Sequence, residues 1–267
     1  MNAFFNQIDD CSLHNNSMLC VGLDTDPERI PQILQNDPDP VFSFNREIIN
    51  ATSDLVSCYK PQIAYYGAMG TEDSLQKTIA HAKSKGIPVI IDSKRGDIGS
   101  TAEMYAKEAF ERFGADAVTI NPYMGLDSLE PFLEYEDKGI FILCRTSNPG
   151  GSDLQNLELA SGQTLYEHVA SLAATQWNKN NNIGLVVGAT RPEEIAAIRE
   201  ITGGMTFLLP GVGAQGADVE KMMANGQGGR MIINASRSIL YASDQSDFAQ
   251  KARESAEKTR AEINQYR

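Results

Sequence analysis

The chain has 267 residues, with 35 acidic and 23 basic side chains and a formal net charge of −12. A chain of this length forms one or two domains, and α/β barrels commonly reach this size as a single domain. The acidic balance argues against a general nucleic-acid-binding protein, because the average surface repels a phosphate backbone. A small phosphorylated ligand remains compatible with this charge, since it needs only one local cationic pocket.

The four cysteines and the apolar runs indicate the compartment. No cysteine belongs to a Cys-x-x-Cys pair and three lie in apolar runs, so we expect reduced, buried side chains. Residues 1–20 lack the basic and then apolar pattern of a secretory signal. No apolar run approaches the roughly 18 residues of a membrane span. We therefore expect a cytoplasmic protein with neither a membrane nor a nucleic-acid partner.

Eight short apolar runs alternate with helical patterns along the chain. Continuous apolarity is typical of strands that are buried on both faces. The predicted strands are residues 18–23, 55–59, 87–91, 116–120, 139–144, 183–187, 206–209 and 230–233. The predicted helices are residues 42–53, 74–85, 101–113, 125–134, 164–178, 192–200, 218–224 and 246–265. This series predicts the α/β class and a single (β/α)8 TIM barrel over residues 1–267, with an open eight-stranded sheet as the alternative.

Polar or charged residues directly follow most of the apolar runs. In a barrel, the carboxyl ends of the strands carry the active site, so these positions are the candidates for function. In chain order the eight ends carry Asp24, Lys60, Asp92 with Lys94, Asn121, Arg145 with Thr146 and Ser147, Gly188 with Ala189, Pro210 with Gly211, and Ser236 with Arg237.

The densest group of charges is formed by Asp92, Lys94 and Asp97. Residues two apart on a strand project to the same side, so Asp92 and Lys94 are predicted to lie together at the barrel mouth. A lysine between carboxylates keeps its proton. It therefore suits the role of fixed cation or proton donor better than that of Schiff-base nucleophile. A surface ion-pair cluster is the alternative interpretation.

A glycine-rich segment follows the seventh run and precedes a helix. Backbone N–H groups in such a segment, together with a helix amino terminus, can bind a phosphate. Gly211, Gly213 and Gly216 also satisfy the dinucleotide pattern G-x-G-x-x-G, but the acidic residue expected about 20 positions later is missing. We interpret the segment as a phosphate site, with Arg237 as its fixed charge and Gln215 as a further donor.

The remaining candidates for chemistry lie away from the strand ends. His14 belongs to the amino-terminal segment, and His81 and His168 lie in predicted helices. A Ser-His-Asp hydrolase or a histidine-ligated metal site is therefore disfavoured. Trp177 is interpreted as a packing residue and Asp26 as a helix cap.

Several sequence blocks carry a resemblance to a known family. The core block is residues 89–101, in which Asp92, Lys94, Asp97, Ile98 and Thr101 fit the pattern D-x-K-x-x-D-I-x-x-T. Further blocks are Gly22-Leu23-Asp24, Lys60-Pro61, Ser147-Asn148-Pro149-Gly150, residues 210–215 and Arg237-Ser238-Ile239. In this order the blocks resemble the orotidine 5'-phosphate decarboxylase family, in a longer bacterial branch. Arg95-Gly96 and Ser236 are departures from the family pattern.

The resemblance implies that a TIM barrel converts orotidine 5'-phosphate to UMP and CO2, the last step of de novo pyrimidine synthesis, without a cofactor or metal. It makes Lys94 the group that stabilises and protonates the C6 carbanion, and Asp92 the group that holds Lys94. It also implies a homodimer in which Asp97, a further catalytic residue, reaches the neighbouring site together with Ile98 and Thr101. The implied substrate-binding residues are Asp24, Lys60, Ile98, Thr101, Ser147, Pro210, Gly211, Gln215, Ser236 and Arg237.

Two alternatives stay open at this point. A magnesium-dependent sugar-phosphate decarboxylase or aldolase of the same barrel group shares the lysine motif and the phosphate site. Such enzymes carry a carboxylate at the end of the second strand, where this chain has Lys60, and an ammonium group opposes a divalent cation. The other alternative is a catalytically silent nucleotide-binding barrel, which would be expected to lack Lys94 or one of its carboxylates.

Overall fold

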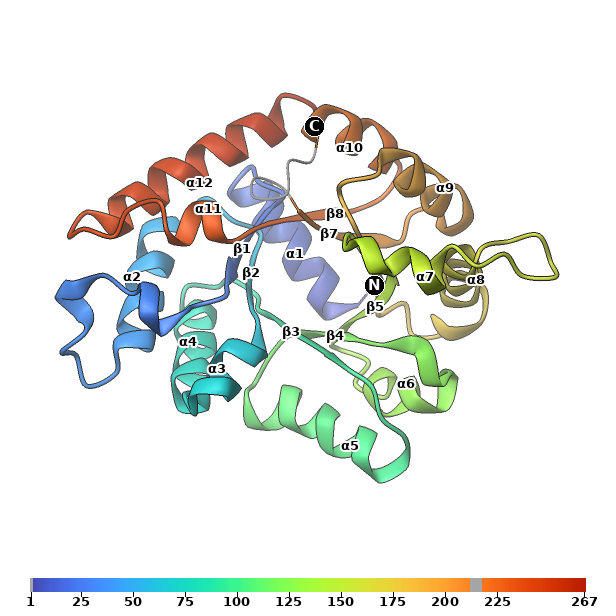
Figure 1. Cartoon of the computed structure of the whole chain (residues 1–267), viewed down its shortest axis with the longest axis horizontal. Coiled ribbons are helices and arrows are strands. Elements are labelled where there is room, and N and C mark those ends of the chain that lie inside the picture. Colours follow the sequence, from blue (N-terminus) through green and yellow to red (C-terminus); the bar gives the residue numbers. More distant parts are fainter. Residues whose placement is uncertain (1, 212–217) are drawn as a thin grey trace.

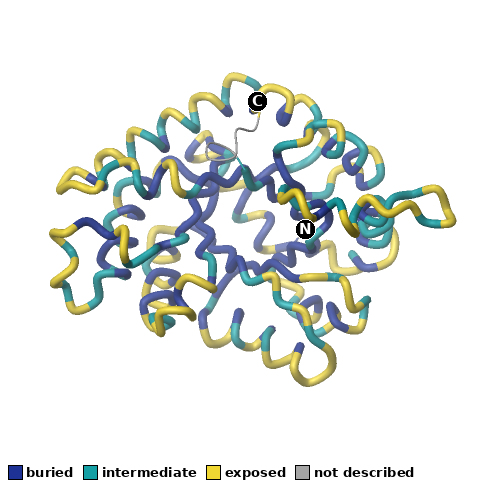
Figure 2. The backbone as a smooth tube through the Cα atoms, in the orientation of Figure 1, coloured by how far each residue is buried: buried dark blue, intermediate teal, exposed yellow. Residues whose placement is uncertain are grey.

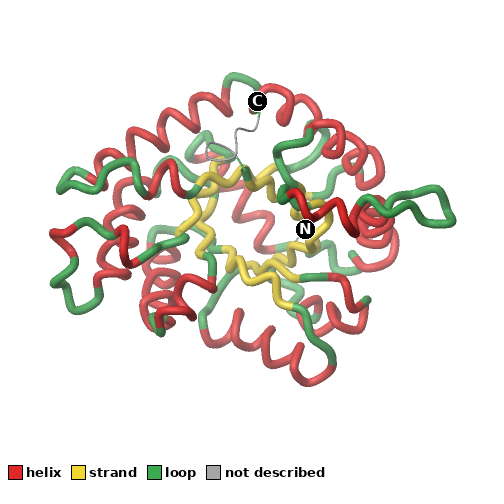
Figure 3. The backbone as a smooth tube through the Cα atoms, viewed as in Figure 1, coloured by secondary structure: helices red, strands yellow, loops and turns green. Residues whose placement is uncertain are grey.

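The computed structural model describes residues 2–211 and 218–267, and its eight strands form one ring of parallel neighbours (Figures 1 and 3). The hydrogen-bonded order is β2-β1-β8-β7-β6-β5-β4-β3. Isolated bridges from Tyr59 to Val89 and from Gln62 to Asp92 join β2 to β3 and close the ring. The predicted barrel is confirmed, and the open sheet is wrong. The strands are β1 (Leu19–Leu23), β2 (Cys58–Pro61), β3 (Ile90–Arg95), β4 (Ala117–Ile120), β5 (Gly139–Arg145), β6 (Ile183–Val187), β7 (Thr206–Pro210) and β8 (Met231–Ala235).

Most helices surround the ring of strands, and the first one lies behind the ring, within its outline (Figures 1 and 3). The helices are α1 (Ala3–His14), α2 (Pro40–Thr52), α3 (Ile63–Met69), α4 (Glu72–Ser84), α5 (Gly99–Lys107), α6 (Leu126–Leu133), α7 (Ser152–Gln155), α8 (Leu165–Leu172), α9 (Pro192–Thr202), α10 (Val219–Gly226), α11 (Arg237–Leu240) and α12 (Phe248–Asn264). Within the described ranges, none of them has the length and apolarity that a membrane crossing needs.

Some predicted boundaries differ from those in the structure. The run 55–59 begins too early, because Leu55 and Val56 are buried in the connection that precedes β2. The predicted helices 101–113 and 164–178 each end in a π-helical turn, over Glu108–Arg112 and Ala173–Trp177. Trp177 is buried there, as expected of a packing residue. Helix α1 is a further difference, because no helix is predicted before the first strand.

Most strand residues are apolar because the two faces of the strands meet two different cores. Outward side chains pack against the helices in one large cluster. Inward side chains form a second cluster inside the barrel, and Figure 2 shows the buried ring that results. The inward members contributed by the strands are Cys20, Cys58, Ile90, Ala117, Phe141, Val186, Leu208 and Ile232.

Helix α1 closes the amino-terminal end of the barrel, and we call this end the floor. Phe4, Phe5 and Ile8 of α1 belong to the inner cluster. The Phe4 ring packs edge-on against Phe141 with their centroids 6.0 Å apart. Gly139 leaves the space for Phe4, since a Cβ atom there would lie 2.3 Å from the Phe4 ring. Among the described residues, α1 blocks the amino-terminal end, so a ligand is expected to enter at the carboxyl ends of the strands.

Candidate active site

Polar side chains replace apolar ones toward the open end of the barrel, which we call the mouth. In Figure 1 the mouth faces the viewer, with α1 behind the strands. By the period of two along each strand, Lys60 follows Cys58, Asp92 follows Ile90, and Thr119 follows Ala117 on the inward side. Lys60, Asp92 and Thr119 therefore lie side by side on β2, β3 and β4.

Asp92 is the centre of an ionic network at the mouth. The Nζ atom of Lys60 lies 2.9 Å from Oδ2 of Asp92, and the Nζ atom of Lys94 lies 2.5 Å from Oδ1. Lys60 is only 4% exposed, whereas the Lys94 side chain is 42% exposed. The network therefore presents one buried cation, one buried anion and one cation that a ligand can reach.

The two buried members of this network hold each other in their charged forms. Burial alone would raise the pKa of Asp92, but Lys60 and Lys94 lower it well below its usual range. Burial alone would lower the pKa of Lys60, but Asp92 and Asp24 raise it above its usual range. Both groups are consequently charged at neutral pH.

Lys94 meets Asp92 through an irregularity in β3 and not through regular alternation. Ile91 pairs with Val118 and Arg95 pairs with Ile120, so the three residues 92–94 lie opposite Thr119 alone. Lys94 has a φ of 50°, in the left-handed region that non-glycine residues rarely adopt. The prediction that the two side chains meet is confirmed, but a bulged strand brings them together.

Sequence reasoning missed Thr119, which is buried and contacts this bulge directly. Its Oγ1 donates to Oδ1 of Asp92 at 2.9 Å and accepts the backbone N–H groups of Ser93 and Lys94, each at 3.0 Å. The Ser93 hydroxyl donates to the Thr119 carbonyl at 3.0 Å. A polar residue at an inward position of the run 116–120 was the available signal.

Asp24 lies at the end of β1 with an unsatisfied carboxylate oxygen. Its Oδ1 atom is buried and has no hydrogen-bond partner among the described residues. The Tyr241 hydroxyl fixes the backbone here, since it donates to the Asp24 carbonyl at 3.0 Å and accepts the Asp26 N–H at 2.7 Å. Asp26 caps the short helix Pro27–Arg29, as predicted. A buried acceptor without a partner is a natural position for a ligand hydroxyl.

The predicted phosphate residues follow two neighbouring strands. Pro210, the last residue of β7, pairs with Asn234 of β8. Gly211 follows with a φ of 121°, which favours glycine. Ser236 lies over Gly22, where a Cβ atom would come within 1.9 Å of the serine hydroxyl. Arg237 begins α11 and is exposed, whereas Gln215, Gly213 and Gly216 lie outside the described residues.

Asp97, Ile98 and Thr101 do not join the network within one chain. Oδ1 of Asp97 accepts the N–H of Ile98, and Asp97 forms no ion pair with a described residue. Ile98 is 57% exposed and Thr101, in the first turn of α5, is also exposed. Within the described part of one chain, Lys94 therefore pairs with Asp92 but not with Asp97.

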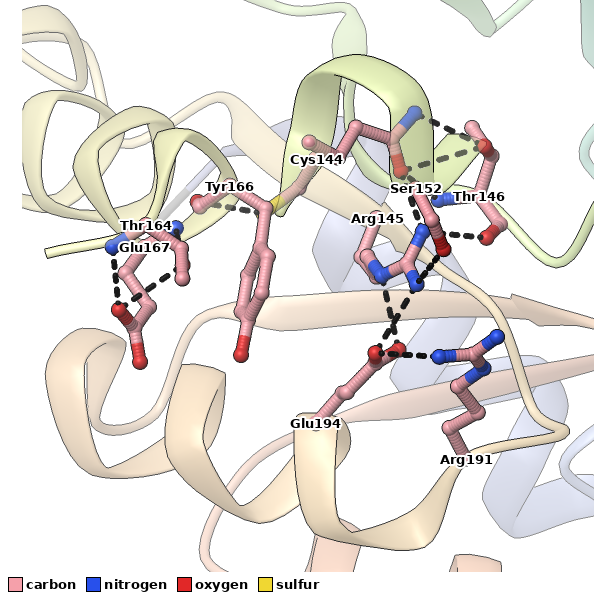
Figure 4. Close-up of polar contacts among 10 residues, drawn as sticks. Cys144, Arg145, Thr146, Ser152, Thr164, Tyr166, Glu167, Arg191 and Glu194 are labelled. Atoms are coloured by element: carbon pink, nitrogen blue, oxygen red, sulfur yellow. Dashed lines mark hydrogen bonds and ion pairs between the residues drawn. The ribbon is translucent and has the colours of Figure 1, made fainter. Parts of the chain in front are cut away.

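Ser147 follows β5 and rests against the end of β6. A Cβ atom on Gly188 would lie 3.0 Å from the Ser147 nitrogen, so glycine favours this close approach. Arg145, two residues earlier, is 1% exposed. Its side chain points outward toward α9 and not into the mouth. Its Nε atom lies 2.8 Å from Glu194 (Figure 4).

Arg145 also stabilises the segment that follows Ser147. Its guanidinium donates to Gln155 at 2.8 Å, and Gln155 in turn accepts the Thr146 N–H at 2.9 Å. Glu194 binds Arg191 at 3.3 Å, which adds the start of α9 to the same cluster (Figure 4). This buried ion pair, also missed from sequence, anchors both ends of the connection 146–155.

Three comparisons with known proteins agree with this geometry. The family model described as "Orotidine 5'-phosphate decarboxylase / HUMPS family" matches residues 17–252. The chain is 58% identical over 257 residues to "Orotidine 5'-phosphate decarboxylase" of Azoarcus sp., and 56% identical to the protein of that name from Aromatoleum aromaticum. Each match covers 94% of this chain and 95% of the relative. The solved OMP decarboxylase of Leishmania donovani is 36% identical, with a TM-score of 0.82 and 98% of each chain covered.

The barrel, the ionic network at its mouth and these relatives define an enzyme of the carboxy-lyase class. Its active site is expected at the carboxyl ends of the strands, as in other TIM barrels. The chain belongs to the orotidine 5'-phosphate decarboxylase / HUMPS family.

Proposed function

We propose that this enzyme converts orotidine 5'-phosphate to UMP and CO2 without a cofactor, with Lys94 as the proton donor. The observation that carries the proposal is the network at the mouth, in which Asp92 holds a reachable ammonium group 2.5 Å away. Family membership supports the same substrate.

The chemistry requires a fixed cation at the reacting carbon. When the bond between C6 and the carboxylate breaks, its electron pair stays on C6 in the plane of the ring and cannot delocalise into a carbonyl. A preorganised positive charge stabilises this developing carbanion, and electrostatic stabilisation is usually the largest single contribution to catalysis. Lys94 would then transfer a proton from Nζ to C6 and recover it from solvent.

Lys60 favours this reaction over a magnesium-dependent one. Its ammonium group occupies the buried position beside Asp92 that a divalent cation would share with the same carboxylate. Magnesium prefers oxygen ligands, and a lysine held protonated by Asp92 and Asp24 repels it. We assign to Lys60 the role of keeping Asp92 ionised and pointing at Lys94.

The remaining groups would bind the nucleotide. The unpartnered oxygen of Asp24 suits a ribose hydroxyl, and Ser147 would bind the pyrimidine edge. Gly211, Ser236 and the exposed guanidinium of Arg237 would bind the phosphate together with Gln215. Pro210 would support this segment from the end of β7. Binding energy from this distant phosphate can be used to organise the reacting centre.

A homodimer would complete the site. Ile98, Met104 and Tyr123 are large apolar side chains with exposures of 57%, 62% and 78%. Ile98 and Met104 lie next to Asp97 and Thr101 in the sequence. A partner subunit that packs on these side chains would receive Asp97 and Thr101 beside its own active site. If so, mixing inactive Lys94→Ala and Asp97→Ala chains restores activity to about a quarter of wild type, because half the dimers then hold one intact site. No recovery after subunit exchange would contradict the shared site.

The deciding experiment follows the ultraviolet absorbance of orotidine 5'-phosphate after addition of purified protein, with and without EDTA. We expect conversion to UMP at the same rate in both. Conversion that EDTA abolishes would favour the magnesium-dependent alternative. UMP binding without any conversion would identify a silent binding protein.

A further inference from the structure

We propose that Thr119 is a positioning residue that sets the geometry of the Lys94–Asp92 pair through its side-chain hydroxyl. This inference rests on the proposed function, because that function makes Lys94 the proton donor. Thr119 is 1% exposed, so it acts through its neighbours and not on the substrate.

The hydroxyl of Thr119 uses its full bonding capacity at the bulge. A hydroxyl has one donor and two acceptor sites. The donor site binds Oδ1 of Asp92, and the two acceptor sites bind the N–H groups of Ser93 and Lys94. The same carboxylate oxygen of Asp92 also accepts a hydrogen bond from Nζ of Lys94. One atom of Thr119 is therefore bonded to the backbone of the lysine and to the side chain that holds its ammonium group.

This arrangement matters because the strand itself offers the bulge little support. Residues 92–94 face Thr119 alone on β4, so the ladder has a single residue opposite three. A left-handed φ at a non-glycine residue costs free energy and persists only where the surroundings over-determine it. The two N–H bonds to Thr119 supply this constraint, and the Ser93 hydroxyl adds a third bond to the Thr119 carbonyl.

The consequence for catalysis is that Thr119 fixes the place from which Lys94 reaches its target. Without the hydroxyl, two N–H groups at the bulge lose their acceptor and Oδ1 of Asp92 loses a donor. Residues 93 and 94 then regain freedom, and the ammonium group moves relative to C6. A displacement of about 1 Å can cost on the order of 10²-fold in rate.

The test compares Thr119→Val, which removes the hydroxyl at nearly constant volume, with Thr119→Ser, which keeps it. We expect kcat to fall by about 10- to 100-fold in the valine variant. The dissociation constant of UMP changes by less than about threefold, because the phosphate groups are untouched. Serine restores most of kcat. Thr206→Val is the matched control, since Thr206 is equally buried on β7 and bonds Arg230 away from the network.

A second measurement does not depend on turnover. Hydrogen exchange of a peptide that spans residues 92–95 is expected to accelerate in Thr119→Val and to return toward wild type in Thr119→Ser. If wild-type protein fails to convert orotidine 5'-phosphate, the proposed function fails, while this exchange measurement still decides whether the hydroxyl holds the bulge.

Two results would overturn the proposal. In the first, Thr119→Val keeps both the kcat and the hydrogen-exchange rate of wild type. In the second, the valine and serine variants lose kcat equally. Should Thr119→Val fail to fold, Thr119→Ser is compared with Thr119→Ala, because these two smaller side chains differ only in the hydroxyl. Equal kcat and equal exchange in that pair would also overturn it.

Discussion

At the floor of the barrel, Phe4, Phe5 and Ile8 pack among apolar inward side chains, whereas at the mouth the same strands present Lys60 and Asp92. At the floor, the inward side chains of the strands and of α1 are apolar, and their burial stabilises the fold. The mouth holds a buried ion pair, a lysine with a left-handed φ and an unpartnered carboxylate oxygen. Each of these features costs free energy unless its surroundings compensate for it. The difference indicates that the floor stabilises the fold. At the mouth, groups that chemistry needs are kept although they lower the stability.

Lys94→Ala should affect chemistry at the mouth far more than it affects stability. We expect kcat to fall by about 10⁴-fold or more, because the variant loses both the fixed charge and the proton donor. The free energy of unfolding should change by less than about 1 kcal/mol, since the side chain is partly exposed and Asp92 keeps Lys60 as its partner. Turnover and urea unfolding measure the two effects. A large loss of stability with kcat retained would reverse the roles we assign to the two ends.

The opposite pattern is expected for Phe4→Ala at the floor. Removing a buried phenyl ring should lower the free energy of unfolding by about 3–5 kcal/mol. The kcat of the folded fraction at 25 °C should stay near that of wild type. Leu13→Ala is the matched control, because Leu13 lies on the same helix but is 81% exposed and should change stability by less than about 0.5 kcal/mol. A loss of kcat in folded Phe4→Ala protein would show that floor and mouth are coupled.

A smaller loss of activity is expected when phosphate binding at the mouth is removed and the reacting centre is left intact. Arg237→Ala should lower kcat/KM for orotidine 5'-phosphate by about 10- to 100-fold, the value of a hydrogen bond to a charged group. With orotidine, which lacks the phosphate, wild type and variant should react at the same slow rate. Steady-state kinetics on both substrates provide the measurement. An equal loss on orotidine would place Arg237 at the reacting centre instead of at the phosphate.

The smallest expected effect concerns Asp39, which caps the start of α2 and bonds Ser74 and Lys77 of α4. Burial alone would raise the pKa of Asp39, but hydrogen bonds from Lys77, Ser74 and the Phe42 N–H lower it overall. A lowered pKa contributes stability above the usual value of 3.8, and this contribution is lost as the pH falls through the folded-state pKa. Asp39→Asn keeps a capping oxygen and cannot titrate.

Wild type should therefore exceed Asp39→Asn in stability by a few tenths of a kcal/mol at pH 7, since the pair with Lys77 is largely exposed. The gap should close as the pH drops below 3.8. Urea unfolding at several pH values tests this expectation. A gap that stays constant down to pH 2 would show that the carboxylate charge is not the cause.

Most of the barrel could be predicted from the sequence because its pattern is local. Eight apolar runs with helices between them determine strand order and place Asp24, Lys60 and Asp92 at the same end. The run 55–59 was misplaced because buried apolar residues in a connection resemble a strand. Helix α1 was missed because its role depends on Gly139 and Phe141, which come much later in the chain.

The fine geometry of the mouth could not be predicted for a similar reason. The bulge at residues 92–94 depends on one hydroxyl of the next strand, and strand periodicity contains no sign of it. The outward turn of Arg145 depends on Glu194, which lies 49 positions away on α9. Such details come from contacts between elements, whereas sequence patterns report on elements one at a time.

The seal at the floor also imposes an order on folding. The Asn2 side chain bonds the carbonyl of Glu136, 134 positions away, and Phe4 packs on strand residues from the same later part of the chain. During synthesis α1 emerges well before β5, so Phe4 and Phe5 lack their aromatic partner Phe141 until β5 has been made. Contacts of such sequence separation form late and slow the folding rate. Helix α1 is made before the strands that it covers and is therefore among the last elements to reach its native position. Until then it exposes an apolar surface that promotes aggregation.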